Sequence, residues 1–122
     1  MTAHATRMSL QEIVLMMHGG EYGRAISLLE GEVSNEGRSP EEKTDCCLWL
    51  AECHQRVDDQ KSAGDWYLEA VKRILNQKLD NKLKAEKALP LCDKAMECYK
   101  AGGDAADVLM TARLRQYFLG LK

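Results

Sequence analysis

The sequence predicts an all-α domain of six helices, arranged as three antiparallel helix hairpins. Small and large residues recur at helical spacing between residues 47 and 70, so two stripes face each other across a turn. These stripes are Cys47, Leu50, Ala51 and His54 on one helix, and Ala63, Tyr67 and Ala70 on the next. Two glycine pairs, Gly19-Gly20 and Gly102-Gly103, mark places where one helix ends and another begins. A single domain over residues 1–122 is therefore expected, with hairpins at about 9–35, 40–77 and 81–120.

The first and third helices have the clearest start signals. Ser9 and Ser39 are each followed three residues later by a glutamate, the capping-box pattern, and Pro40 takes a first helical position that needs no backbone donor. From these signals and the apolar periodicity we expect helices at about 9–18, 21–35, 40–56, 59–77, 81–101 and 104–120.

The fifth helix contains Pro90, which removes a backbone donor and should either kink the helix or start a new one. Leu75, Leu79 and Leu83 follow one another at four-residue spacing. This spacing predicts that the extension over residues 76–89 is helical.

The three hairpins repeat one another at fixed offsets. A shift of 38 residues aligns Ala25 with Ala63, and a shift of 45 aligns Cys47 with Cys92. The two glycine pairs are 83 residues apart, as the two shifts together require. The packing stripes of the second hairpin resemble the tetratricopeptide repeat, and the resemblance extends over nearly the whole chain. It implies three hairpins stacked as a right-handed TPR-like superhelix that serves as a binding scaffold.

Some members of this family hold the carboxylate tail of heat-shock chaperones with Lys, Asn and Arg side chains. The aligned positions here are Leu10, Val14, Trp49, Pro90 and Lys94. Only one of them is a cation, so an adaptor for chaperone tails is not expected.

In such a stack the first helix of each hairpin lines a concave groove, which is the expected site for a partner peptide or helix. The candidate groove residues are Leu10, Val14, Met17, His18, Leu48, Trp49, Glu52, Arg56, Asp93, Lys94, Glu97 and Lys100. The apolar run from Ile13 to Met17 surrounds the first helix, so one neighbouring helix cannot cover it. The alternative is that the N-terminal segment wraps this helix and makes it core.

The last helix has apolar residues on all sides and no following helix to cover them. Tyr117, Phe118 and Leu121 are therefore candidates for self-association into a homodimer. Alternatively, this end folds back on the extension after Leu75.

No catalytic, metal or cofactor site is expected. Cys46, Cys47, Cys53 and His54 cannot share one metal ion, because Cys46 and Cys53, like Cys47 and His54, are seven residues and roughly 10 Å apart along a helix. The five cysteines are odd in number and lie in helical patterns, which favours packed, reduced thiols and a cytoplasmic location. The longest wholly apolar run is far shorter than the roughly 20 residues of a membrane span.

The net charge of -2 gives no strong attraction to nucleic acid, although seven basic residues oppose three acidic ones between Lys72 and Lys94.

The expected function is a non-enzymatic adaptor or small chaperone that binds another protein in the groove. Compact three-repeat members of the family include chaperones for subunits of bacterial secretion machines. The alternative is a structural subunit that self-assembles through its C-terminal helix.

Overall fold

The computed structural model describes residues 8–122, and over this range it contains six α-helices and no strand. The helices are α1 (Leu10–His18), α2 (Tyr22–Val33), α3 (Pro40–Arg56), α4 (Gln60–Leu75), α5 (Asn81–Ala101) and α6 (Ala105–Leu119). The all-α class and the six helices predicted from the sequence are confirmed.

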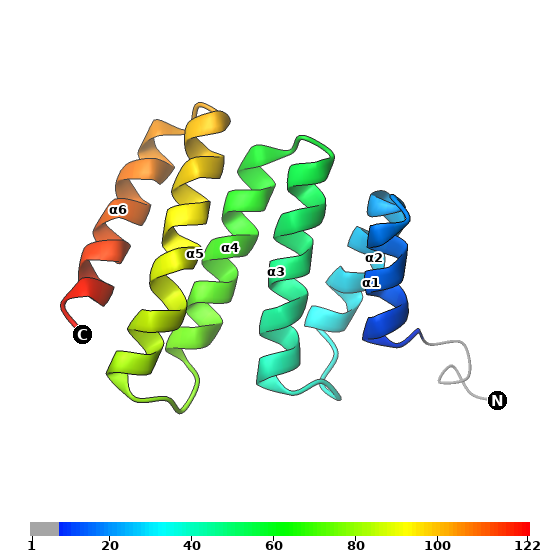
Figure 1. The fold of residues 1–122 in the computed structure, drawn as a ribbon, viewed down its shortest axis with the longest axis horizontal. Coiled ribbons are helices and arrows are strands. Elements are labelled where there is room, and N and C mark those ends of the chain that lie inside the picture. Colours follow the sequence, from blue (N-terminus) through cyan, green and yellow to red (C-terminus); the bar gives the residue numbers. More distant parts are fainter. Residues whose placement is uncertain (1–7) are drawn as a thin grey trace.

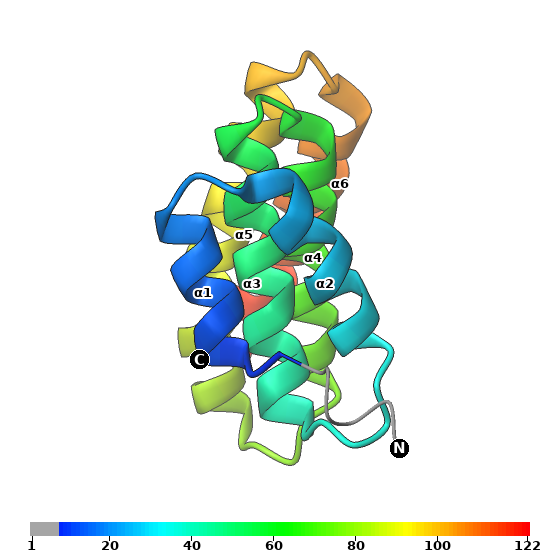
Figure 2. The same ribbon diagram turned by 90° about the vertical axis from the view of Figure 1, so that its right-hand side faces the viewer.

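The helices form a stack in which each packs mainly against its neighbours in the chain. Figure 1 shows α6, α5, α4 and α3 in a row, with α1 and α2 at the opposite end from α6. Seen along that row, α1, α3 and α5 lie on one side and α2, α4 and α6 on the other (Figure 2). The two layers follow from three antiparallel hairpins placed side by side.

The capping boxes at Ser9 and Ser39 form as the sequence predicts. Each serine hydroxyl accepts from the backbone N–H of the glutamate three residues on, Glu12 or Glu42, and each glutamate accepts in return from the serine backbone. These reciprocal bonds satisfy backbone donors that the first helical turn leaves free.

The turns inside the three hairpins share one geometry. Each places a residue with positive φ after the first helix, namely Gly20 (86°), Asp58 (61°) and Gly103 (76°). In each, the next backbone N–H bonds to a carbonyl five residues back, namely Glu21 to Met16 (3.0 Å), Asp59 to His54 (2.8 Å) and Asp104 to Tyr99 (2.9 Å). This is the Schellman pattern, and its three copies are separated by the same 38 and 45 residues as the sequence repeats.

The break between α4 and α5 lies where the predicted helices at about 59–77 and 81–101 place it. Leu79 lies in the loop between the two helices, and the Asp80 side chain caps α5 by accepting from the backbone N–H of Leu83 (2.8 Å). The extension predicted over residues 76–89 is helical from Asn81 onward, whereas residues 76–80 form the loop, because Asp80 caps the start of α5. That helix continues through Pro90, so no new helix starts there. Pro90 and Glu86, whose carbonyl loses its helical donor, are both exposed.

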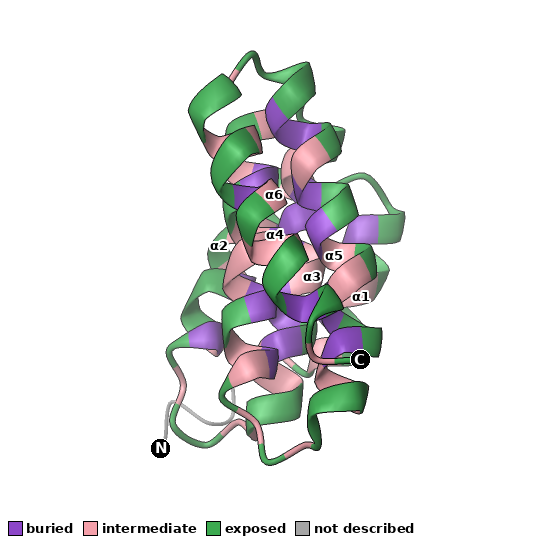
Figure 3. Ribbon diagram, turned by 90° about the vertical axis from the view of Figure 1, so that its left-hand side faces the viewer, coloured by how far each residue is buried: buried purple, intermediate pink, exposed green. Residues whose placement is uncertain are grey.

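Three apolar clusters follow one another along the stack, and Figure 3 shows the buried positions between the two layers. The first joins α1, α2 and α3 with Ala70 of α4, the second joins α3 to α5, and the third joins α4, α5 and α6. In the second cluster α4 and α5 approach closely at Gly64. A Cβ atom added to this glycine would lie only 2.7 Å from the Tyr99 ring. Within residues 8–122, no helix combines the length and apolar character needed to cross a bilayer.

Candidate protein-binding site

The odd-numbered layer carries a depression of about 500 Å³ between α1 and α3. It is lined by Leu10, Gln11, Val14, Leu15, His18 and Trp49. Its surface is largely apolar, and Leu15 is 68% exposed. The opposite face of α1 carries Ile13 and Met16, which are buried. Among residues 8–122, the first helix therefore serves as core on one face and leaves a second apolar face open, and the N-terminal segment expected as an alternative cover lies outside the described residues.

A second depression of about 290 Å³ adjoins the first and shares His18 with it. It is lined by Met17, His18, Tyr22, Glu52 and Arg56. Met17 lines this depression although it is largely buried, because it also packs into the first apolar cluster. Glu52 and Arg56 are exposed and give this part of the surface both signs of charge. The linings of the two depressions together are called the α1–α3 surface below.

Leu48 does not join this surface. It is partly buried between the first and second apolar clusters and borders a separate depression shared with α4 and α5.

The α5 residues predicted for the groove line neither depression of the α1–α3 surface. Asp93 pairs with Arg115 of α6 at 2.7 Å, and the ammonium of Lys94 lies 5.9 Å from the centre of the Tyr67 ring on α4. Lys100 borders a depression beside the α5–α6 turn, whereas Glu97 is exposed. The α1 and α3 residues predicted for the groove thus line these two depressions without the α5 residues.

The C-terminal helix buries a residue that the sequence predicted to be available for self-association. Phe118 is fully buried in the third cluster, and Leu121 packs against that cluster. Only Tyr117 of the three candidates is exposed, at 52%. Phe118 instead follows the alternative stated above, because it packs on Ala85 and Ala88 of the extension after Leu75 and is not available for self-association.

Two features were missed from the sequence. Leu109 and Met110 of α6 are 56% and 52% exposed, although the last helix was expected to expose its C-terminal end instead. The repeat offsets could have identified both positions, because they align with α4 residues that face α5.

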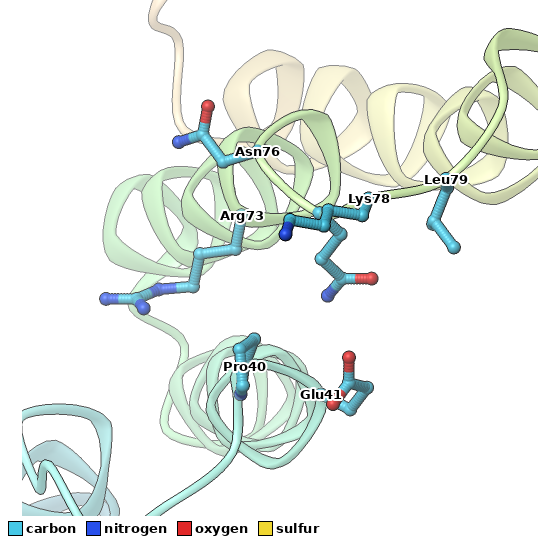
Figure 4. A pocket seen from close by; sticks show the side chains of 7 residues that line it. Pro40, Glu41, Arg73, Asn76, Lys78 and Leu79 are labelled. Carbon is cyan, nitrogen blue, oxygen red and sulfur yellow. The ribbon is translucent and has the colours of Figure 1, made fainter.

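The second missed feature is a depression of about 500 Å³ where the α4–α5 loop passes the start of α3 (Figure 4). Glu41, Arg73 and Lys78 give its lining charges of both signs. This makes it a poorer match than the α1–α3 surface for an apolar partner.

The five cysteines are all free and buried. Burial raises the pKa of Cys46, Cys47, Cys53 and Cys92 to about 11, and it also raises the pKa of Cys98. Near neutral pH they are neutral thiols inside the core and poor nucleophiles. The prediction that they are packed thiols is confirmed.

His54 lies between α3 and α4 with Nδ1 3.4 Å from a carboxylate oxygen of Asp59, but no thiol is paired with it. In the part of the chain that the structure describes, no three His, Cys, Asp or Glu side chains are grouped so that they could hold a metal ion.

Comparison of the chain with protein families, with curated proteins and with solved structures finds no match.

Proposed function

We propose that this protein is a non-enzymatic binding module, an adaptor or small chaperone, that holds an apolar helix of a partner protein on the α1–α3 surface. The observation that carries the proposal is the open apolar face of α1 beside Trp49. Apolar surface on a helix that already packs through its other face is typical of a docking site.

The spacing on α1 suits a helical partner. Leu10, Val14 and His18 lie four residues apart and form one ridge along the helix, and Gln11 and Leu15 form a second. A partner helix can place its side chains in the groove between such ridges. Trp49 closes one side of this groove and supplies a large anchor of the kind that dominates binding energy.

Charge at one end of the surface would set the direction of the partner. Glu52 and Arg56 lie beyond His18, in the second depression. A bound helix with apolar residues in the first depression and a charged residue of either sign over the second would find a complementary group there. The buried thiols, together with this interaction role, favour a reducing compartment such as the cytoplasm.

The test starts from helical peptides selected by display on the immobilised protein. Binding of a selected, labelled peptide is then measured by fluorescence anisotropy on wild type, on Val14→Glu and on Val57→Glu. Val57 is also exposed but lies in the α3–α4 turn, so it provides a matched control.

Val14→Glu should weaken binding at least tenfold, whereas Val57→Glu should leave it unchanged. A proline placed in the middle of the peptide should abolish binding, because it interrupts the helix. In a Trp66→Phe background, the emission of Trp49 should also change on binding. Equal binding to wild type and Val14→Glu would overturn the proposal, and unimpaired binding of the proline peptide would show an extended partner instead.

A further inference from the structure

The two ends of the helix stack expose apolar residues at positions that are buried between hairpins inside the chain. On α1 this residue is Leu15. The repeat offsets align it with Cys53 of α3 and Cys98 of α5. Cys53 lies in the cluster that α3 shares with α2, and Cys98 in the cluster that α5 shares with α4, so each is covered by the preceding hairpin. Within residues 8–122 no helix precedes α1, and Leu15 is 68% exposed.

The opposite end of the stack shows the complementary feature on α6. The offset of 45 aligns Leu109 and Met110 with Gly64 and Asp65 of α4. Both α4 residues meet the next hairpin: Gly64 backs onto the Tyr99 ring, and Asp65 accepts a hydrogen bond of 2.5 Å from the Tyr99 hydroxyl. Leu109 and Met110 thus occupy the place where an even-numbered helix receives the next odd-numbered one.

The residues at the two ends match each other in chemistry. Tyr99 aligns with Met16 of α1, which is buried, so an α1 helix docked on α6 would bring the neighbouring exposed residue Leu15 to Leu109 and Met110. An apolar contact would then replace the polar contact between Asp65 and Tyr99. Such a contact keeps no polar group buried without a partner.

A charge pair supports the same register. Arg113 of α6 aligns with Leu68 of α4, and Glu12 of α1 aligns with Ala95 of α5. Leu68 and Ala95 belong to the same apolar cluster across the α4–α5 interface. Arg113 and Glu12 are both exposed, and Arg113 has no ion-pair partner among residues 8–122. Docking α1 on α6 would therefore place opposite charges at neighbouring positions.

We propose that copies of this chain associate head to tail, with α1 of one copy packed on α6 of another as if it were the next helix of the stack. The two surfaces lie at opposite ends of one molecule (Figure 1), so a single copy cannot bring them together. The interface is heterologous, and each added copy leaves one free α1 and one free α6. Growth is open-ended unless the rotation between copies closes a ring.

The association is tested by sedimentation velocity and light scattering over a wide range of protein concentration. The variants are Leu15→Glu at one end, Met110→Glu at the other, and Val57→Glu as an exposed apolar control away from both ends. Leu15→Ala and Met110→Ala are milder versions of the same changes. Circular dichroism checks that each variant stays helical.

The average mass of wild type and of Val57→Glu should rise with concentration above the 13.7 kDa of one chain. Leu15→Glu and Met110→Glu should each remain at the mass of one chain, and the alanine variants should shift assembly to higher concentration. An equimolar mixture of the two glutamate variants should double the mass and go no further, because each partner keeps one intact surface. This complementation is specific to a head-to-tail contact.

Wild type that stays monomeric up to millimolar concentration would overturn the proposal. So would disassembly by Met110→Glu together with normal assembly of Leu15→Glu, because this result would show two α6 helices paired with each other. The proposed association shares Leu15 with the α1–α3 surface, so the variant that separates the two proposals is Met110→Glu, whose change lies on α6. Monomeric Met110→Glu should still bind the selected helical peptide, so a failure of one proposal is distinguishable from a failure of the other.

Discussion

Gly64 is the position where the α4–α5 packing makes the sharpest prediction. In an exposed helix, Gly→Ala stabilises by about 0.5–1 kcal/mol, because alanine restricts the unfolded chain and favours the helix. At Gly64 the new methyl group would lie 2.7–2.9 Å from three carbons of the Tyr99 ring. Non-bonded carbons prefer about 3.5–4.0 Å. The ring is almost fully buried and its hydroxyl is bonded to Asp65, so it cannot move aside freely.

We therefore expect Gly64→Ala to be destabilising, because overpacking costs typically about 1–3 kcal/mol and exceeds the helix-propensity gain. Gly31→Ala is the matched control: this glycine lies in α2, and its Cβ would meet nothing within 4 Å. The two variants should differ in unfolding free energy by roughly 2 kcal/mol, with opposite signs relative to wild type. Urea unfolding followed by circular dichroism measures this difference.

A double-mutant cycle with Tyr99→Leu identifies the cause. When the ring is absent, Gly64→Ala should lose most of its cost, and the coupling between the two sites should be on the order of 1–2 kcal/mol. If Gly64→Ala stabilises the protein as much as Gly31→Ala does, the close approach of α4 and α5 is not rigid and the reasoning fails.

Three further predictions concern the core, the turns and the thiols. Phe118→Ala should lower stability by about 3–5 kcal/mol and Tyr117→Ala by less than about 1 kcal/mol in thermal or urea unfolding, since only Phe118 is buried. Similar values for the two would contradict the packing of α6. Asp58→Gly should raise stability by up to about 1 kcal/mol and Gly103→Ala should lower it by about as much, because both positions have positive φ. The opposite order would show that the turns differ. The raised pKa of buried Cys47 means that the folded state keeps its proton where the unfolded state has lost it. Stability should thus be full below about pH 8.5 and fall as the pH rises toward 11, by up to about 1.4 kcal/mol per pH unit per thiol, and Cys47→Ala should reduce this slope in urea titrations at several pH values.

The helices were predictable because their signals are local. Ser9 and Ser39 cap helices through residues three positions away, and the glycine pairs fix turns within five residues. The Asp58 turn has no glycine, but its place in the repeat gives it the same conformation. Stacking of the hairpins as a right-handed superhelix stays a prediction.

The site was only partly predictable, because side-chain direction on α5 and α6 depends on how the helices rotate against each other. Four apolar residues surround the end of α6, and no periodicity indicates that Phe118 is the one that faces α5. Asp93 was expected in the groove but pairs with Arg115, an interaction 22 residues away in sequence. Leu10, Val14 and Trp49 line a surface depression, because within residues 8–122 α1 has too few neighbours to cover its apolar face, and their role in binding stays a prediction.

The chain-order packing of the helices has a consequence for how the molecule opens. With contacts made mainly between neighbours in sequence, local unfolding can begin at either end without disturbing the middle. α1 is the shortest helix, with nine residues, and a helix of that length is not stable alone in water. Amide hydrogens of α1 should accordingly exchange faster than those of α4. A ligand bound to α1 would slow amide exchange most in α1 itself. The protection from exchange would decrease along the stack toward α6.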